Sequence, residues 1–253
     1  MSVTIDQIKS LRERTGVSMS SCKSALEEAN GDENLAVDVL RKKGESKAAE
    51  RSDRNTANGV VAIAQKDGTA AMIAIACETD FVAKNEDFVK RVQGFAERLL
   101  NEGEGADFSA DIADMNITMG EKVEIKDKKV ASGAKLASYK HSNNRIGVLV
   151  SLSGGSEELG KDLAMHVAAM SPKTLSPEDI GAELVAKERE IWTEQLKQEG
   201  KPEQIIEKIM EGKEKKFREE FALLTQAFVK NPDQLIKDLI GTEKIEGFWR
   251  FEV

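Results

Sequence analysis

The stretch Cys77-Glu78-Thr79-Asp80-Phe81-Val82-Ala83-Lys84 lies where the pattern of apolar residues changes from one period to another. The run Ala70–Ala76 before it is almost wholly apolar, which predicts a buried strand. An amphipathic helix is predicted to begin near Asn85, directly after it. We therefore expect the stretch to form a turn between a strand and a helix in an α+β protein.

The turn leaves two roles open for its aromatic residue, Phe81. A core position at the end of the strand is one of them. The other is an exposed anchor for a partner's pocket, with the charge of Asp80 beside it, as at binding hot spots. The residues of the turn alone do not decide between the two.

A predicted hairpin precedes this turn. Strands are expected over 59–65 and 70–78, joined by Lys66-Asp67-Gly68, a favourable hairpin turn. The helix after the turn is expected over 85–100. Residues 101–134 are less regular.

Within that less regular region, Val123 and Ile125 indicate a short strand, followed by a polar turn at Lys126–Lys129. A second hairpin then follows over 135–152, with its turn at Asn143-Asn144 and a helix over 157–170. Hairpin and helix thus occur twice in the same order. This repetition predicts two similar core subdomains, one over 56–140 and one over 141–253.

Three short amphipathic helices are predicted before the first hairpin. Thr4 begins the first with a capping box, Ser18 caps the second, and the third is expected to stop at Gly44. A bundle of this size is marginally stable by itself. We assign it, together with a charged linker, to an N-terminal domain over 1–55.

Residues 177–221 show two long charged helices with narrow apolar stripes, separated by Gly200-Lys201-Pro202. Helices joined by so short a break fold back as an antiparallel pair. Two core helices of a compact domain are the alternative, but the dense outer charges favour a projecting coiled-coil hairpin. A short helix over 233–240 and a strand over 245–253 are predicted after it.

Composition narrows the function. The chain of 253 residues is 40% hydrophobic and 32% charged, which is typical of a globular protein, and it has no apolar run long enough for a membrane span. Its net charge of −8 argues against direct nucleic-acid binding, which would need a basic face, and favours a protein partner. The N-terminus lacks the pattern of a secretion signal, so we expect a cytoplasmic protein.

The cysteines and histidines do not predict a catalytic or metal site. Cys22 and Cys77 lie in apolar patterns, which indicates reduced core residues rather than a disulfide. His141 and His166 have no metal-ligand spacing with other residues. His166 lies on an apolar helix face and is expected to be a hydrogen-bonded core residue. We expect neither a metal nor a cofactor.

Residues Gly155–Lys161 nearly match a phosphate-binding loop between a strand and a helix. The next residue is Asp162, where that motif needs a hydroxyl group for magnesium. Glu157 and Glu158 would also place negative charge beside the phosphates. A helix start capped by Ser156 explains the pattern better.

Blocks spread over nearly the whole chain, in the same order, resemble the bacterial translation elongation factor Ts family. They are Leu11-Arg-Glu-Arg-Thr-Gly16, Cys22-Lys23, Ala29-Asn30-Gly31-Asp32, Thr79-Asp80-Phe81-Val82-Ala83-Lys84, Arg145–Val150, Ala164–Ala169 and Arg250–Val253. The resemblance favours the anchor role for Phe81.

This resemblance implies a non-enzymatic guanine nucleotide exchange factor for elongation factor Tu. Such a factor binds the GDP complex, disturbs its magnesium and phosphate contacts, and promotes GDP release. The resemblance also implies that the N-terminal helices form a bundle like a ubiquitin-associated (UBA) domain, and that the chain forms a homodimer or a heterotetramer with its partner.

The resemblance implies partner contacts at particular residues. The turn Thr79, Asp80, Phe81 and Val82 would dislocate the magnesium ion of elongation factor Tu. The other expected contacts are Arg12, Met19, Lys23, Met119, Gly120, His141 and Val229. The chain departs from the family at Ser20-Ser21, where an apolar residue and an Asp or Asn are usual, and less strongly at Met119 and Lys230. Residues 101–134 are also compressed relative to the family pattern, so the resemblance implies shortened helices there.

Two other classes of function compete with exchange. A ubiquitin-type adaptor would use the N-terminal bundle, but it would not require the blocks beyond residue 56. An enzyme that uses the near phosphate loop would bind nucleotide by itself.

Overall fold

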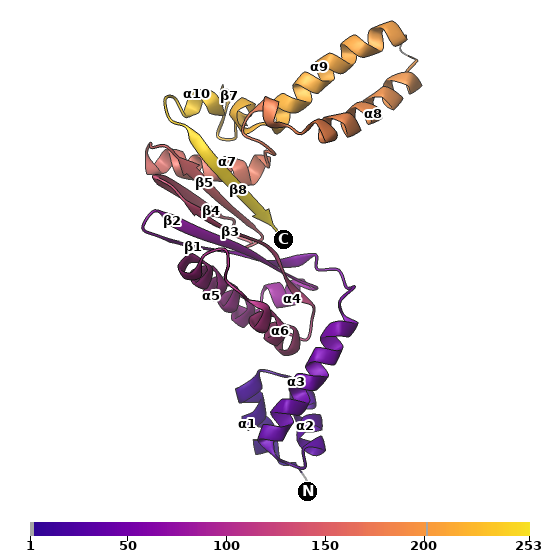
Figure 1. The fold of residues 1–253 in the computed structure, drawn as a ribbon, viewed down its shortest axis with the longest axis vertical. Helices are drawn as coiled ribbons and strands as arrows, with labels where there is room; N and C mark the ends of the chain where they lie inside the picture. Colours follow the sequence, from indigo (N-terminus) through magenta and orange to yellow (C-terminus); the bar gives the residue numbers. More distant parts are fainter. Residues whose placement is uncertain (1–2, 201) are drawn as a thin grey trace. The chain divides into compact units, whose positions relative to one another are not determined.

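The computed structural model describes residues 3–200 and 202–253, which divide into two compact units (Figure 1). The first contains Met1–Ala131, Lys140–Gly147 and Phe251–Val253. The second contains Ser132–Tyr139 and Val148–Arg250. Helices and small sheets occur in both, as expected of an α+β chain.

The first unit begins with three helices, α1 (Ile5–Thr15), α2 (Met19–Glu28) and α3 (Glu33–Glu50). Thr4 and Gln7 form the predicted capping box, and the Ser18 hydroxyl accepts the Ser21 amide hydrogen. The helices share an apolar core made of Ile8, Leu11, Val17, Cys22, Ala25, Leu26, Ala29, Ala36 and Leu40. The three predicted helices are therefore present, and the first two begin where the sequence predicts.

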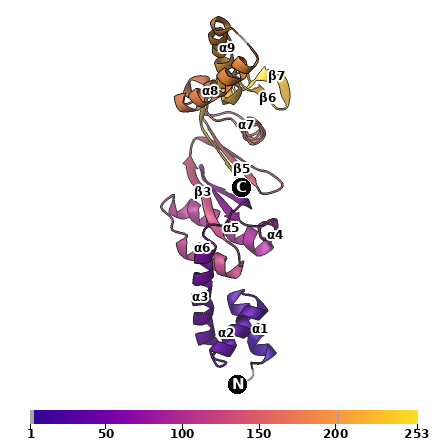
Figure 2. The same cartoon turned by 90° about the vertical axis from the view of Figure 1, so that its right-hand side faces the viewer.

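The end predicted for the third helix was wrong. α3 continues through Gly44 and ends at Glu50, because this glycine serves close packing rather than termination. A Cβ at Gly44 would collide with the side chain of Ile117, which comes from a helix far along the chain. Figure 2 shows that helix, α6, beside α3. The charged linker, which the sequence indicates from Glu45 onward with a partly helical start, is helical as far as Glu50.

The main sheet of the first unit has the order β1 (Asn58–Lys66), β2 (Thr69–Cys77), β3 (Val123–Ser132). β1 and β2 form the predicted antiparallel hairpin, in which Lys66 pairs with Thr69. Helix α5 (Glu86–Glu102) packs on both strands. It contributes Phe88, Val92, Phe95, Ala96 and Leu99 to the core.

Of the expectations for residues 101–134, one agrees with the structure and one was wrong. Helix α6 (Ser109–Thr118), of ten residues, is a short helix of the expected kind, but β3 runs straight through the expected turn at Lys126–Lys129. The helix lies against α5, with ion pairs from Arg98 to Asp111 (2.7 Å) and from Arg91 to Asp114 (2.5 Å). β3 is an edge strand, where exposed lysines are common because they discourage pairing with another chain.

The second unit contains a sheet of order β4 (Lys135–Lys140), β5 (Ile146–Leu152), β8 (Ile245–Glu252). Helix α7 (Glu157–Met170) follows β5 and buries Leu163, Ala164 and Val167. The second hairpin, the helix after it and the terminal strand are thus where the sequence predicts them.

Helices α8 (Ala182–Gln198) and α9 (Glu203–Phe221) fold back on each other in this unit (Figure 1). They share a small apolar cluster made of Leu196, Ile206 and Met210, with Trp192 and Ile209 packed against it. A short 3-10 turn, η1 (Pro177–Asp179), precedes α8.

The chain after α9 is more irregular than predicted. It contains the 3-10 turn η2 (Leu223–Thr225), the paired short strands β6 (Ala227–Phe228) and β7 (Asn231–Leu235), and helix α10 (Ile236–Leu239). The helix predicted over 233–240 is thus a strand for its first residues, because pairing with β6 extends them. None of the helices in the described part of the chain has both the length and the apolar character needed to cross a membrane.

Candidate functional site

The stretch between β2 and α5 folds as a single helical turn, α4 (Asp80–Ala83), rather than as an irregular turn. Thr79 precedes it in an extended conformation, and its hydroxyl accepts the Val82 amide hydrogen over 3.4 Å. Val82 and Ala83 pack against the core under the sheet. The inner side of the turn is therefore fixed by apolar contacts.

Phe81 points away from that core and is 82% exposed. The core role left open by the sequence is wrong, because almost the whole ring is accessible to water. Isolated exposed apolar residues are common in proteins. An exposed phenylalanine on a turn anchored from below nevertheless has the form of a binding anchor.

Asp80 lies beside this ring and is also exposed. Its carboxylate accepts a hydrogen bond from the Lys84 ammonium at 2.6 Å, and this bond lowers the pKa of Asp80 below its usual value. The turn therefore presents an aromatic ring and an ionised carboxylate side by side.

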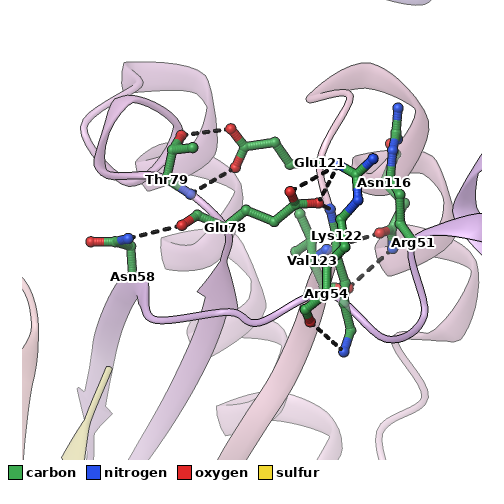
Figure 3. Close-up of polar contacts among 9 residues, drawn as sticks. All are labelled: Arg51, Arg54, Asn58, Glu78, Thr79, Asn116, Glu121, Lys122 and Val123. Atoms are coloured by element: carbon green, nitrogen blue, oxygen red, sulfur yellow. Dashed lines mark hydrogen bonds and ion pairs between the residues drawn. The ribbon is translucent and has the colours of Figure 1, made fainter.

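A carboxylate from a distant part of the chain holds the start of the turn (Figure 3). Glu121 accepts the Thr79 hydroxyl hydrogen at 2.5 Å with one oxygen, and the Thr79 amide hydrogen at 3.0 Å with the other. Glu121 is not among the site residues predicted from the sequence. It lies 42 residues from Thr79, in a region without clear periodicity.

Glu78 makes the converse contact. Its carboxylate accepts the Lys122 amide hydrogen at 2.6 Å and a hydrogen bond from Arg54 at 3.0 Å. Burial alone would raise the pKa of Glu78, but the hydrogen bonds from Lys122 and Arg54 outweigh it and lower that pKa. The Glu78 carbonyl also accepts a hydrogen bond from the Asn58 side chain at 2.9 Å (Figure 3).

Cys77, the residue directly before Glu78, is buried and has a free thiol. Burial, and next the charge of Glu121, raise the pKa of its thiol to about 12. Its sulfur donates to the Thr79 carbonyl at 3.3 Å. The thiol is thus a packed core group, as expected for both cysteines, since Cys22 is buried as well.

The same contacts bring two predicted site segments together. Met119 and Gly120 lie immediately before Glu121, at the end of α6. Met119 is partly buried against the core, whereas Gly120 is exposed with a φ of 72°, in the region that favours glycine. Both line a groove that also includes Ser20 and Ser21 from α2.

The predicted contacts on the N-terminal helices are exposed. Arg12 lies near the end of α1, and Met19, at the start of α2, is 37% exposed. Lys23, one turn later, makes an exposed ion pair with Glu27 at 3.8 Å.

His141 is exposed between β4 and β5. Its carbonyl accepts the Asn144 amide hydrogen at 2.9 Å, and its own amide donates to Ile146. Asn144 has a φ of 57°, which confirms the turn predicted at Asn143-Asn144. His141 thus lies on a well-formed hairpin end.

Val229 lies in the second unit, at the exposed turn between β6 and β7. Its amide donates to Nδ1 of the fully buried His166 at 3.2 Å. Because Nδ1 accepts, the proton is on Nε2, which lies 3.0 Å from a Gln226 oxygen. Burial lowers the pKa of His166. The expected core histidine is confirmed, and it supports the Val229 turn, a link that the sequence did not reveal.

Residues Gly155–Lys161, which nearly match a phosphate-binding loop, form the capped start of a helix, as predicted. The Ser156 hydroxyl accepts the Leu159 amide hydrogen at 3.1 Å. The Glu243 carboxylate lies against Gly154 and would repel a phosphate there. Within residues 3–200 and 202–253, no group of three or more His, Cys, Asp and Glu side chains is placed to hold a metal ion.

Comparison with known proteins adds independent information. The family described as elongation factor TS matches residues 78–253. The elongation factor Ts of Psychrobacter cryohalolentis is 40% identical, over 99% of this chain and 90% of that protein. The elongation factor Ts of Aeromonas hydrophila is 41% identical, over 97% and 89%. That of Dinoroseobacter shibae is 40% identical, over 100% of this chain and 93% of that protein.

Proposed function

The chain belongs to the elongation factor Ts family, the nucleotide exchange factors for elongation factor Tu, and on this premise we propose that its Thr79–Val82 turn promotes the release of GDP. The observation that carries the proposal is the 82% exposure of Phe81 on a turn whose other side is packed and hydrogen-bonded.

Phe81 is the anchor in this proposal. Its backbone is already held by α4 and by the hydrogen bonds of Thr79, so little conformational freedom is lost when the ring enters a pocket of the partner. Truncation of a buried aromatic anchor typically costs ~2–4 kcal/mol of binding free energy. The ring therefore has enough binding energy to disturb a neighbouring site.

Asp80 adds a negative charge at the same position. It is ionised at neutral pH, because Lys84 lowers its pKa. A carboxylate beside the inserted ring competes for hydrogen-bond donors and helix N-termini near the partner's magnesium ion. The coordination of magnesium and phosphate would weaken as a result.

Exchange of this kind is reciprocal. If the factor weakens GDP binding, GDP weakens binding of the factor by the same ratio. A coupling free energy of ~3 kcal/mol corresponds to a factor of roughly 150. Most of that factor is expected in dissociation rates.

The remaining expected contacts belong to the same proposal. They are Arg12, Met19, Lys23, Met119, Gly120, His141 and Val229. All of these residues are exposed except Met119, which is partly buried. We also propose that α1–α3 form the UBA-like bundle and that α8 and α9 form a coiled coil. The three N-terminal helices share one apolar cluster, and α8 and α9 share another. We further propose that the protein is cytoplasmic and has no catalytic residues, no cofactor, and no direct contact with nucleic acid or membranes. Its assembly into a homodimer, or into a heterotetramer with elongation factor Tu, can be tested by analytical ultracentrifugation.

The test is release of fluorescent GDP from elongation factor Tu, with the unchanged chain and with Phe81→Ala. We expect the variant to slow stimulated release by one to two orders of magnitude, in line with the ~2–4 kcal/mol above. Its melting temperature should stay nearly constant, because the ring has few contacts to lose.

Phe95→Ala is the matched control, since Phe95 is a core phenylalanine that is only 8% exposed. It should lower the melting temperature sharply, as core truncations do. If Phe81→Ala behaved like Phe95→Ala while its folded fraction still exchanged normally, the anchor role would be wrong. Stimulated release by the unchanged chain also separates exchange from the ubiquitin-type adaptor, which would have no effect on GDP.

A further inference from the structure

The segments 78–79 and 121–122 are joined by a reciprocal pair of carboxylates (Figure 3). Glu78 accepts the backbone N–H of Lys122, and Glu121 accepts the backbone N–H of Thr79. Each glutamate thus binds the amide next to the other glutamate. The arrangement connects the end of β2 with the start of β3.

Glu121 has a second contact that Glu78 lacks. It accepts the Thr79 hydroxyl hydrogen at 2.5 Å, a short bond of the charge-assisted kind. The hydroxyl hydrogen is therefore directed toward Glu121, which leaves the oxygen lone pairs for the Val82 amide hydrogen. Glu121 thereby orients the group that caps α4.

This orientation matters because α4 is only four residues long. A single helical turn is unstable by itself, since its nucleation is unfavourable. Contacts from outside must therefore keep it formed. The packing of Val82 and Ala83 holds one side, and the Thr79 cap holds the start.

We propose that Glu121 is a positioning residue for nucleotide exchange, which holds Thr79 in its capping geometry and so fixes the direction in which Phe81 is presented. The inference rests on the proposed role of Phe81. It adds a residue from a distant segment whose own side chain need not enter the partner.

The experiment compares Glu121→Ala with Glu121→Gln in the full chain. Stimulated GDP release is measured at saturating factor, and hydrogen exchange of the Val82 and Ala83 amides is measured in the free chain. We expect Glu121→Ala to slow release about tenfold, the order expected for lost hydrogen bonds to a charged group. Faster amide exchange should accompany it. Glu121→Gln keeps one acceptor oxygen and should be intermediate in both measurements.

Glu104→Ala is the matched control. Glu104 also accepts a backbone amide hydrogen from β3, that of Val130 at 3.0 Å, and pairs with Lys129 at 2.8 Å. The Glu104→Ala substitution removes the same kind of contact farther along β3. It should change neither GDP release nor the exchange of the Val82 amide.

A double-mutant cycle separates positioning from a general loss of structure. In the Phe81→Ala background, Glu121→Ala should have almost no further effect on release, because the group that it positions is absent. An equal slowing in both backgrounds would overturn the inference. So would unchanged release by Glu121→Ala when Phe81→Ala is slow, and that result would leave the proposed function intact.

If Phe81→Ala itself released GDP normally, the proposed function would fail, and with it the inference. Should Glu121→Ala leave too little folded chain to measure, Glu121→Gln decides the question. A folded Gln variant with full release and unchanged Val82 exchange would then contradict the inference, whereas slower release with faster amide exchange would support it.

Discussion

At the scale of single residues, His166 shows how a buried group can hold an exposed one. Both ring nitrogens have partners, the Val229 amide on one side and Gln226 on the other. Protonation of Nδ1 would remove the acceptor that the Val229 amide needs. The position of that turn therefore depends on a neutral imidazole.

A pH dependence of stability follows from this. Burial lowers the pKa of His166 in the folded chain below the value of about 6.5 in the unfolded chain. Below pH 6.5 the unfolded chain therefore binds more protons, and protonation favours unfolding. The contribution is fully present above about pH 6.5 and is lost as the pH falls from there through the folded-state pKa.

Urea unfolding of the unchanged chain and of His166→Asn between pH 5 and 8 tests this prediction. One proton changes the free energy of unfolding by at most about 1.4 kcal/mol per pH unit. The unchanged chain should lose stability toward pH 5 more steeply than the variant, whose side chain does not titrate. Parallel pH profiles for the two would show that His166 does not titrate on unfolding.

The sequence located the exposed turn but not what holds it. Phe81 and Asp80 could be identified because they are neighbours in a recognisable block. Glu121 could not, since its partner Thr79 lies 42 residues away and a glutamate in a polar loop is usually solvated. Contacts of this kind depend on strand pairing, which a local pattern does not reveal.

At the scale of elements, α3 illustrates a glycine with two opposite effects. Gly44 is a poor helix residue, and alanine in its place would ordinarily stabilise the helix by about 1 kcal/mol. A Cβ there, however, would collide with Ile117 of α6. The collision opposes the gain in helix propensity.

We therefore predict that Gly44→Ala destabilises the unchanged chain but stabilises an Ile117→Ala chain. In the latter, the space beside α3 is free and only the propensity gain of about 1 kcal/mol remains. Thermal or urea unfolding of the four chains measures the coupling between the two positions. Additive effects would mean that Ile117 moves aside without cost.

The elements with strong periodicity were predicted well, and the others were not. β1, β2 and α5 bury regular apolar patterns, so their type and position could be predicted from residues such as Val60 and Phe88. Helix α6 fully buries only Met115 and is held to α5 by the ion pairs of Asp111 and Asp114, which no periodicity reveals. In β3, the polar residues that suggested a turn lie on an edge strand, where Lys126 and Asp127 are exposed and Lys128 and Lys129 are half-buried.

At the scale of the whole molecule, the N-terminal helices and the Thr79–Val82 turn have a junction in common. Arg54 follows α3, donates to Glu78 at 3.0 Å, and accepts a hydrogen bond from the Lys122 ammonium at 3.2 Å through its carbonyl. Arg51 donates to the Asn116 carbonyl at 3.3 Å (Figure 3). The segment 51–54 thus helps to hold the Thr79–Val82 turn in place, although in sequence it follows directly after helices α1–α3.

Two deletions distinguish docking from positioning. Removal of residues 1–50 should weaken binding to elongation factor Tu and lower exchange at limiting concentration, with recovery at high concentration. Removal of 1–54 also takes away Arg54, and release should then stay reduced even at saturation. Titrations of GDP release with each folded deletion give the two quantities separately. Full activity of the shorter deletion at every concentration would exclude the helices from the interface.

If Phe81 enters a pocket of the partner, as we propose, its present exposure also determines how association responds to temperature. A phenylalanine removes roughly 150–250 Å² of surface from water when it is buried. At about 0.45 cal/mol/K per Å² of apolar surface, this gives a negative heat-capacity change on the order of 0.1 kcal/mol/K. Heat released on binding should thus rise steadily with warming, while opposing entropy keeps the affinity nearly level. In a calorimeter, burial of the Phe81 ring should therefore appear as a binding enthalpy that changes with temperature, with little change in the affinity.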